Sequence, residues 1–151
     1  MECPFCNDTV REAVFAQSDN FLALYNIAPI FPGHSLIIPG KHIESIQNLS
    51  DEQLSEMIIF SRKVTDGLLQ VFKAESFNWS LQEKESAGQT IAHLHWHIVL
   101  RFPGDMPNPG DWYPKIKSNY REMLDSEFRT KLNAAEMKQI VKKLRGYFNY
   151  G

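Results

Sequence analysis

Three histidines alternate with apolar residues two thirds of the way along the chain. His93, His95 and His97 stand in the run His-Leu-His-Trp-His-Ile-Val-Leu, which ends at residue 100. Successive side chains of a strand point to opposite faces, so this pattern predicts a row of imidazoles on one face and buried apolar side chains on the other. Imidazole titrates near neutral pH and can act as a nucleophile, a general base or a metal ligand. Three such groups in alternation indicate a functional site.

Two kinds of chemistry fit the alternating histidines. Three imidazoles can hold a catalytic metal and leave a fourth position open, and the spacing alone leaves this alternative standing. Residues 85–90, just upstream, carry a glycine, an amide and hydroxyls, which can offer hydrogen-bond donors to phosphate oxygens. Donors of this kind beside imidazoles favour phosphoryl chemistry. A neutral imidazole is a good nucleophile at pH 7, and a covalent intermediate divides one difficult displacement into two easier ones.

The segments that must position these histidines predict an α+β fold. Short apolar runs bounded by turn-forming residues predict strands over 12–17, 21–25, 35–39, 77–82 and 93–101. A capping box of Ser50 and Gln53, followed by apolar residues at helical spacing, predicts a long helix over about 50–73. Asn133, with Glu136 three residues later, predicts the start of a C-terminal helix. We therefore expect a five-stranded, mainly antiparallel sheet with a long helix and a C-terminal helix.

The composition is that of one globular domain of 151 residues, with 43% apolar and 23% charged residues and no apolar run long enough to cross a bilayer. The N-terminus has neither the basic start nor the apolar stretch of a secretory signal, so we expect a cytoplasmic protein that does not associate with membranes. In the reducing cytosol its two cysteines are not expected to form a disulfide.

The net charge of −2 hides an uneven distribution. Residues 1–100 carry 6 basic and 12 acidic side chains, whereas residues 101–151 carry 10 basic and 6 acidic ones. The basic C-terminal part could attract a nucleotide or a nucleic acid, but a solvated helix face explains it equally well. Because no aromatic residues are interleaved with these charges, a nucleic-acid partner is not expected.

Three linked motifs resemble those of the histidine triad (HIT) superfamily of nucleotide hydrolases and transferases. Residues 93–99 match its motif of three histidines alternating with apolar residues at every position. Ala-Gly-Gln-Thr at 87–90 and Phe-Pro-Gly-His-Ser-Leu-Ile-Ile-Pro at 31–39 look like its other two motifs. The resemblance covers about residues 3–105. It implies one HIT domain over 1–151, with residues 106–151 as a basic extension packed on or beside it.

The resemblance also implies roles for single residues. His95 corresponds to the nucleophile that attacks the α-phosphorus, and His97 to the histidine that contacts the α-phosphate oxygens. His34 matches the histidine that helps to orient the triad, and Thr90 the residue that assists the leaving group. Asn26 falls where the family binds the ribose. The residues that would hold the phosphates are Gln82, Gly88, Gln89, Thr90 and Ile91.

A second signal is the pair Cys3 and Cys6. Two cysteines at this spacing can bind zinc, can be redox-active or can be ordinary thiols. Some bacterial HIT proteins place a zinc on such a pair together with a histidine after the third strand and the first triad histidine, which are His42 and His93 here. The resemblance therefore implies one structural zinc per chain and no organic cofactor. Fragile histidine triad hydrolases, which the chain resembles around Asn26 and the phosphate residues, lack the cysteine pair.

The function expected from these features is that of a nucleotide hydrolase. It would cleave dinucleoside polyphosphates, such as diadenosine tri- or tetraphosphate, through a nucleotidyl-histidine intermediate and release a nucleoside monophosphate. A nucleoside phosphoramidase or phosphorylase of the same family is one alternative. A nucleotide-binding module with little turnover is another, although pure binding would not need a nucleophile. The resemblance further implies a homodimer.

Overall fold

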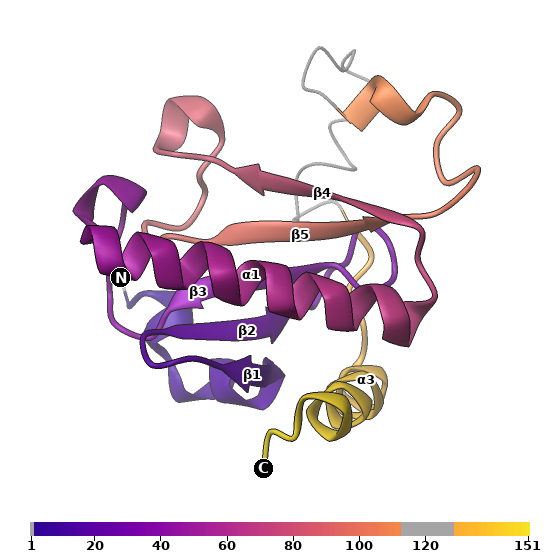
Figure 1. Cartoon of the computed structure of the whole chain (residues 1–151), viewed down its shortest axis with the longest axis horizontal. Helices are drawn as coiled ribbons and strands as arrows, with labels where there is room; N and C mark the ends of the chain where they lie inside the picture. The colour runs from indigo at the N-terminus through magenta and orange to yellow at the C-terminus, as the bar shows by residue number, and fades with distance from the viewer. Residues whose placement is uncertain (1, 113–128) are drawn as a thin grey trace.

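A five-stranded sheet forms the centre of the molecule in a computed structural model that describes residues 2–112 and 129–151 (Figure 1). Its strands are β1 (Val14–Gln17), β2 (Phe21–Tyr25), β3 (Ser35–Pro39), β4 (Ser76–Leu81) and β5 (Trp96–Arg101). The spatial order is β1-β2-β3-β5-β4, and each neighbouring pair is antiparallel. The predicted α+β class with a five-stranded antiparallel sheet is confirmed.

Helix α1 (Asp51–Phe72) lies across one face of this sheet (Figure 1). The predicted capping box is present, because Ser50 accepts from the Gln53 amide while the Gln53 side chain accepts from the Ser50 amide. A cap of this kind stabilises a helix by about 1 kcal/mol. Met57, Val64 and Leu68 of α1 are fully buried against the sheet in the main hydrophobic core. None of the helices in the described part of the chain has the length and apolar character that a membrane span requires.

Helix α3 (Ala134–Phe148) packs beside α1 and along β1. It starts at the predicted capping box of Asn133 and Glu136. Gly67 allows α1 and α3 to approach closely, since a Cβ there would lie 2.3 Å from the ring of Phe148. Arg145 of α3 donates from Nε to the Val14 carbonyl oxygen of β1 at 2.8 Å. The C-terminal helix thereby covers the outer edge of the sheet.

The opposite face of the sheet carries the site. The short helical segment η2 (Asp8–Ala13) lies against β2 and α3, and η1 (Pro4–Cys6) packs against His93 and His95 through Phe5. A transverse row runs across the strands, in which Val14 pairs with Leu24, Leu24 with Leu36, and Leu36 with His97. A row of apolar side chains across the sheet therefore ends beside His97, one of the triad histidines.

Strand β5 begins three residues later than the sequence pattern predicts. The predicted strand starts at His93, whereas the ladder with β4 starts at Trp96. Before that point the chain pairs elsewhere, since the Leu94 amide donates to the Ile43 carbonyl oxygen at 2.7 Å. The alternation of side chains that a strand imposes therefore does not extend back to His93.

Candidate functional site

A cavity of about 1600 Å³ extends over the open face of the sheet. It reaches from β4 and the 88–91 turn, past the triad, to the N-terminal segment and α3. Of the residues predicted to function in catalysis or substrate binding, those that line it are Asn26, Gln82, Gly88, Thr90, Ile91, His95 and His97. The fold thus brings seven predicted residues from four separate segments around one space.

A single backbone contact fixes the tautomer of His95. Its Nδ1 lies 2.7 Å from the carbonyl oxygen of His93, which can only accept, so Nδ1 carries the proton. The lone pair of the neutral ring is therefore on Nε2, the atom that remains to face the cavity. Burial lowers the pKa of His95, against the opposing effects of the His93 carbonyl and the charge of Glu83. The ring is consequently neutral and nucleophilic at pH 7.

His97 and His34 form a coupled pair that fixes two tautomers. The Ile30 amide donates to Nδ1 of His34 at 3.1 Å, so the His34 proton lies on Nε2. Nε2 of His34 lies 2.9 Å from Nδ1 of His97 and donates to it. Nδ1 of His97 therefore accepts, and the proton of His97 lies on Nε2. His97 presents a hydrogen-bond donor where His95 presents a lone pair.

The same pair stays neutral far below neutral pH. Burial, the proximity of His95 and the charge of Arg129 lower the pKa of His97 to about 3. Burial, followed by the effects of His97 and Arg129, holds the pKa of His34 well below its usual value. His34 is completely buried and does not line the cavity, so its ring can influence the cavity only through His97.

The 88–91 turn uses part of its hydrogen-bonding capacity on itself. The amides of Gly88 and Gln89 donate to the carbonyl oxygens of Glu85 and Lys84. The Gln89 side chain accepts from the Lys84 amide and donates to the carbonyl oxygen of Glu44, so it braces the turn and does not line the cavity. Within the described residues, the Thr90 amide has no acceptor, which leaves it available to a phosphate oxygen.

His93 does not share the orientation of the other two histidines. The prediction of three imidazoles on one face is wrong for this residue, because the chain is not in a strand at His93. Its ring is 1% exposed and does not line the cavity. Nε2 donates to the Pro39 carbonyl oxygen at 3.0 Å, which leaves a lone pair on Nδ1. That lone pair points to the two cysteines.

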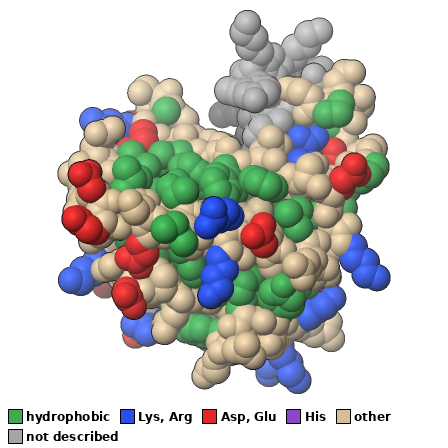
Figure 2. All heavy atoms as spheres, viewed as in Figure 1, with side chains coloured by type: hydrophobic (Ala, Val, Ile, Leu, Met, Phe, Trp, Pro, Cys, Tyr) green, Lys and Arg blue, Asp and Glu red, His purple; other side chains and the backbone are tan. Residues whose placement is uncertain are grey.

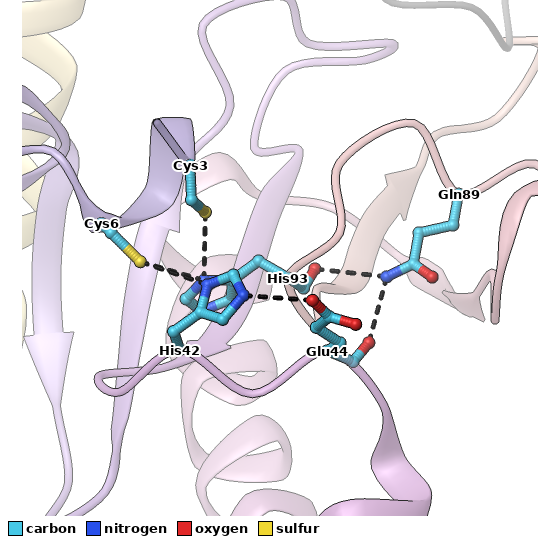
Figure 3. Close-up of polar contacts among 6 residues, drawn as sticks. All are labelled: Cys3, Cys6, His42, Glu44, Gln89 and His93. Atoms are coloured by element: carbon cyan, nitrogen blue, oxygen red, sulfur yellow. Dashed lines mark hydrogen bonds and ion pairs between the residues drawn. The ribbon is translucent and has the colours of Figure 1, made fainter. Parts of the chain in front are cut away.

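Cys3, Cys6, His42 and His93 form a compact cluster (Figure 3). Nδ1 of His93 lies 3.4 Å from Sγ of Cys3 and 3.6 Å from Sγ of Cys6, and Nδ1 of His42 lies 3.4 Å from Sγ of Cys6. Nε2 of His42 lies 3.3 Å from Glu44 Oε1 and donates to it, so His42 also has its lone pair on Nδ1.

The four ligand atoms fit a zinc ion. They lie within 4.8 Å of one another, and the sulfur–nitrogen distances match the edges of a tetrahedron with metal bonds of about 2.0–2.3 Å. Both imidazoles donate their other N–H to an oxygen, as zinc-bound histidines generally do. The predicted ligand set is thus assembled around one point, with a donor set typical of structural zinc.

Arg129 is a residue of the site that the sequence analysis did not single out. It lines the cavity together with His95 and His97, and its Nε donates to the Ala28 carbonyl oxygen at 2.6 Å. In the sequence it is one of ten basic residues after position 100. The charge asymmetry was the one available signal, and it does not distinguish Arg129 from the others.

The site combines a neutral imidazole with an available lone pair, an imidazole that can donate a hydrogen bond, and a turn whose Thr90 amide has no acceptor among the described residues. The HIT domain model matches residues 7–104. The chain therefore belongs to the HIT domain family, as its three motifs imply.

Named relatives and solved structures agree with this assignment. A bis(5'-nucleosyl)-tetraphosphatase [asymmetrical] of Schizosaccharomyces pombe is 31% identical over 115 residues, which cover 76% of this chain and 63% of that protein. A bis(5'-adenosyl)-triphosphatase of Dictyostelium discoideum is 26% identical over 75% of this chain and 79% of its own length. A Zn-bound histidine triad family protein from Mycobacterium smegmatis has the same fold, with a TM-score of 0.71, 22% identity and coverage of 99% and 94% of the two chains.

Proposed function

We propose that this protein hydrolyses dinucleoside polyphosphates, such as diadenosine tri- or tetraphosphate, and releases a nucleoside monophosphate. The observation that carries the proposal is the orientation of His95, whose Nδ1–H is held by a backbone carbonyl while Nε2 is left to the cavity. The names of the two hydrolase relatives support this substrate class. The chain spans 63% of the length of the fission yeast relative. We therefore argue the activity from the site of this chain and not from the whole of that relative.

The reaction proceeds in two displacements. Nε2 of His95 attacks the α-phosphorus, the bond to the bridging oxygen breaks, and the remaining nucleotide leaves, with Thr90 beside the leaving oxygen. Nε2–H of His97 and the Thr90 amide donate to the α-phosphate oxygens as charge develops on them. Water then attacks the phosphorus of the nucleotidyl-histidine, which frees His95 and yields the monophosphate.

The substrate positions follow from the segments that line the cavity. We place the ribose at Asn26, whose Oδ1 accepts from the Ala28 amide and whose Nδ2 lies 3.4 Å from Nε2 of His34. The phosphates would lie along Gln82, Gly88 and Ile91 toward the triad. For Gln89 we propose an indirect part, in which its side chain holds the shape of the turn.

We further propose one zinc ion on Cys3, Cys6, His42 and His93. Bound there, it would cross-link the N-terminal segment to the chain just before β5 and hold His93, whose carbonyl oxygen orients His95. All four positions are filled by protein, so the metal is structural. Thiolate ligands require reduced cysteines, which supports a cytoplasmic location. The Mycobacterium smegmatis protein, which has this fold, is described as Zn-bound, and a zinc ion in this chain would agree with that description.

The homodimer is proposed from an exposed apolar surface. Leu54, Ile58 and Ile59 of α1 and Phe77 of β4 are 37–58% exposed, and Figure 2 shows hydrophobic side chains gathered on this face. β4 is an edge strand whose outer side pairs with no strand among the described residues. A second copy, related by a two-fold axis, would cover the same surface on both chains. The substitution Ile59→Lys should convert a dimer to a monomer in light scattering.

Hydrolysis in ¹⁸O-labelled water tests the proposed function. Attack by His95 on the α-phosphorus requires that the label appear in the nucleoside monophosphate. Label in the other product would exclude the nucleotidyl-histidine. A panel of diadenosine polyphosphates and a nucleoside phosphoramidate, each with and without inorganic phosphate, separates hydrolase, phosphoramidase and phosphorylase, and the absence of turnover with all of them would leave a binding module.

A further inference from the structure

The lysines and arginines of the cavity all come from the C-terminal part of the chain. Among the described residues that line it, they are Arg129, Lys138, Lys142 and Arg145. None of the four lies within residues 7–104, which match the family model. The basic C-terminal part of the sequence thus contributes directly to the wall of the cavity.

A polyphosphate needs such charges in this cavity. The imidazoles of His34 and His97 are neutral at pH 7, because burial lowers the pKa of both. Among the described residues that line the cavity, Glu12 alone carries a carboxylate. A single carboxylate does not form a magnesium site by itself. Neutral donors can orient phosphate oxygens, but a fixed cation stabilises their negative charge more strongly.

Their electrostatic effect on the triad pair distinguishes the four basic residues. Arg145 donates to the carbonyl oxygens of Val14 and Arg11 and lies over the ring of Tyr150, so it serves the packing of α3. Lys138 and Lys142 are exposed on α3. Arg129 alone of the four contributes to the pKa shifts of the triad pair, which places its charge within electrostatic reach of His34 and His97.

The position of Arg129 is fixed by the loop between β2 and β3. Its Nε–H donates to Ala28 at 2.6 Å, and Ala28 in turn donates its amide to Asn26. The same loop holds His34 through the amide of Ile30. The guanidinium, the ribose position and the triad pair are thus tied to one short segment.

We propose that Arg129 is a phosphate-binding residue, whose guanidinium contacts the α-phosphate of the nucleotide beside His97. Arginine suits this task because its planar group remains charged at all relevant pH values and can donate two parallel hydrogen bonds to phosphate. The proposal rests on the proposed function for the identity of the ligand as a nucleotide. It assigns to the C-terminal part of the chain a positively charged phosphate contact, which no lysine or arginine of the matched region supplies among the described residues that line the cavity.

Nucleoside and nucleotide binding separate this role from a structural one. Affinities for adenosine and for AMP are measured by calorimetry with the wild type, Arg129→Gln, Arg129→Lys and the control Lys131→Gln. Lys131 is exposed, belongs to the same segment and does not line the cavity, so its variant makes the same change in net charge. We expect Arg129→Gln to weaken AMP binding by about 10- to 100-fold and adenosine binding by less than about twofold.

Each variant has its own expected affinity. Arg129→Lys should retain an intermediate affinity for AMP, and Lys131→Gln should match the wild type. If Arg129→Gln weakens adenosine and AMP equally, Arg129 only supports the Ala28 loop and the proposal is wrong. Unchanged AMP affinity would overturn it as well. If AMP binding depends on Arg129 while diadenosine polyphosphates are not hydrolysed, the proposed function fails and this inference stands.

Discussion

His93 and His95 are separated by one residue and yet present opposite ring nitrogens to their surroundings. His93 donates from Nε2 to Pro39 and turns the lone pair of Nδ1 to two thiols, whereas His95 donates from Nδ1 and leaves the lone pair on Nε2. In both residues a nearby backbone carbonyl oxygen decides which ring nitrogen carries the proton. The nitrogen that a carbonyl engages thus decides which lone pair the ring offers, to the thiols in the case of His93 and to the cavity in the case of His95. A histidine motif alone therefore does not specify the chemistry of its members.

The sharpest way to break this comparison is to replace His95, the proposed nucleophile. His95→Asn deletes the attacking nitrogen, so turnover of diadenosine triphosphate should fall by several orders of magnitude, as expected when a covalent route is lost. Zinc content should equal that of the wild type, since His95 is not a ligand. Product formation by chromatography and metal content by elemental analysis check both. Activity above a tenth of the wild-type value would exclude His95 as the nucleophile.

Removal of the donor imidazole should have a smaller effect. His97→Asn loses the Nε2–H that would stabilise the α-phosphate oxygens, and we expect kcat to fall by about 10²-fold. His34→Asn keeps His97 but removes the bond that fixes its tautomer, so a loss of about tenfold is expected. Steady-state kinetics of both variants test this order. A larger loss in His34→Asn than in His97→Asn would contradict the tautomer chain.

Loss of the metal cluster should affect stability more than chemistry. The double variant Cys3→Ser with Cys6→Ser should lack zinc and unfold about 5–15 °C lower, because the proposed zinc would link the N-terminal segment to the folded chain. Activity should fall less than tenfold at a temperature where the variant remains folded. Calorimetry with elemental analysis measures both changes. The absence of metal from freshly purified wild-type protein with reduced cysteines would refute the zinc site.

The smallest expected effect concerns pH and stability. The unfolded chain takes up a proton on His97 near pH 6.5, but the folded protein does so only near pH 3. The unfolded state therefore binds more protons, and stability falls as the pH decreases from about 6.5. Between pH 7 and pH 5 the wild type should lose about 2 kcal/mol more than His97→Asn in urea unfolding. Equal losses would show that His97 titrates normally in the folded protein.

Local sequence signals predicted the elements well. The capping boxes at Ser50 and Asn133 are seen as expected, because each depends on residues three positions apart. The start of β5 was predicted too early, since alternation at His93 looks like a strand while a long-range bond of Leu94 to Ile43 diverts the chain. Motifs report residue types, and the direction of a ring depends on distant carbonyl groups.

The remaining gaps in the predicted site have the same origin. Gln89 has a side chain that could donate to phosphate. In the structure, however, its amide group is already hydrogen-bonded to the backbone of Lys84 and Glu44. Arg129 lies 101 residues from Ala28, its hydrogen-bond acceptor, so no local pattern could connect it to the cavity. The clustering of Cys3, Cys6, His42 and His93 could be predicted because the family resemblance supplied contacts between residues that are remote in sequence.

The placement of α3 also limits how copies of this chain can assemble. A sheet with two open edges can add strands at both ends and grow without limit. Here α3 covers the β1 edge, and the β4 edge alone remains open among the described strands. Pairing of two β4 strands would use up the available edge of each copy and give one continuous ten-stranded sheet in the proposed dimer. In such a dimer growth would stop at two copies, because the C-terminal helix of each copy would keep the β1 edge from adding another strand.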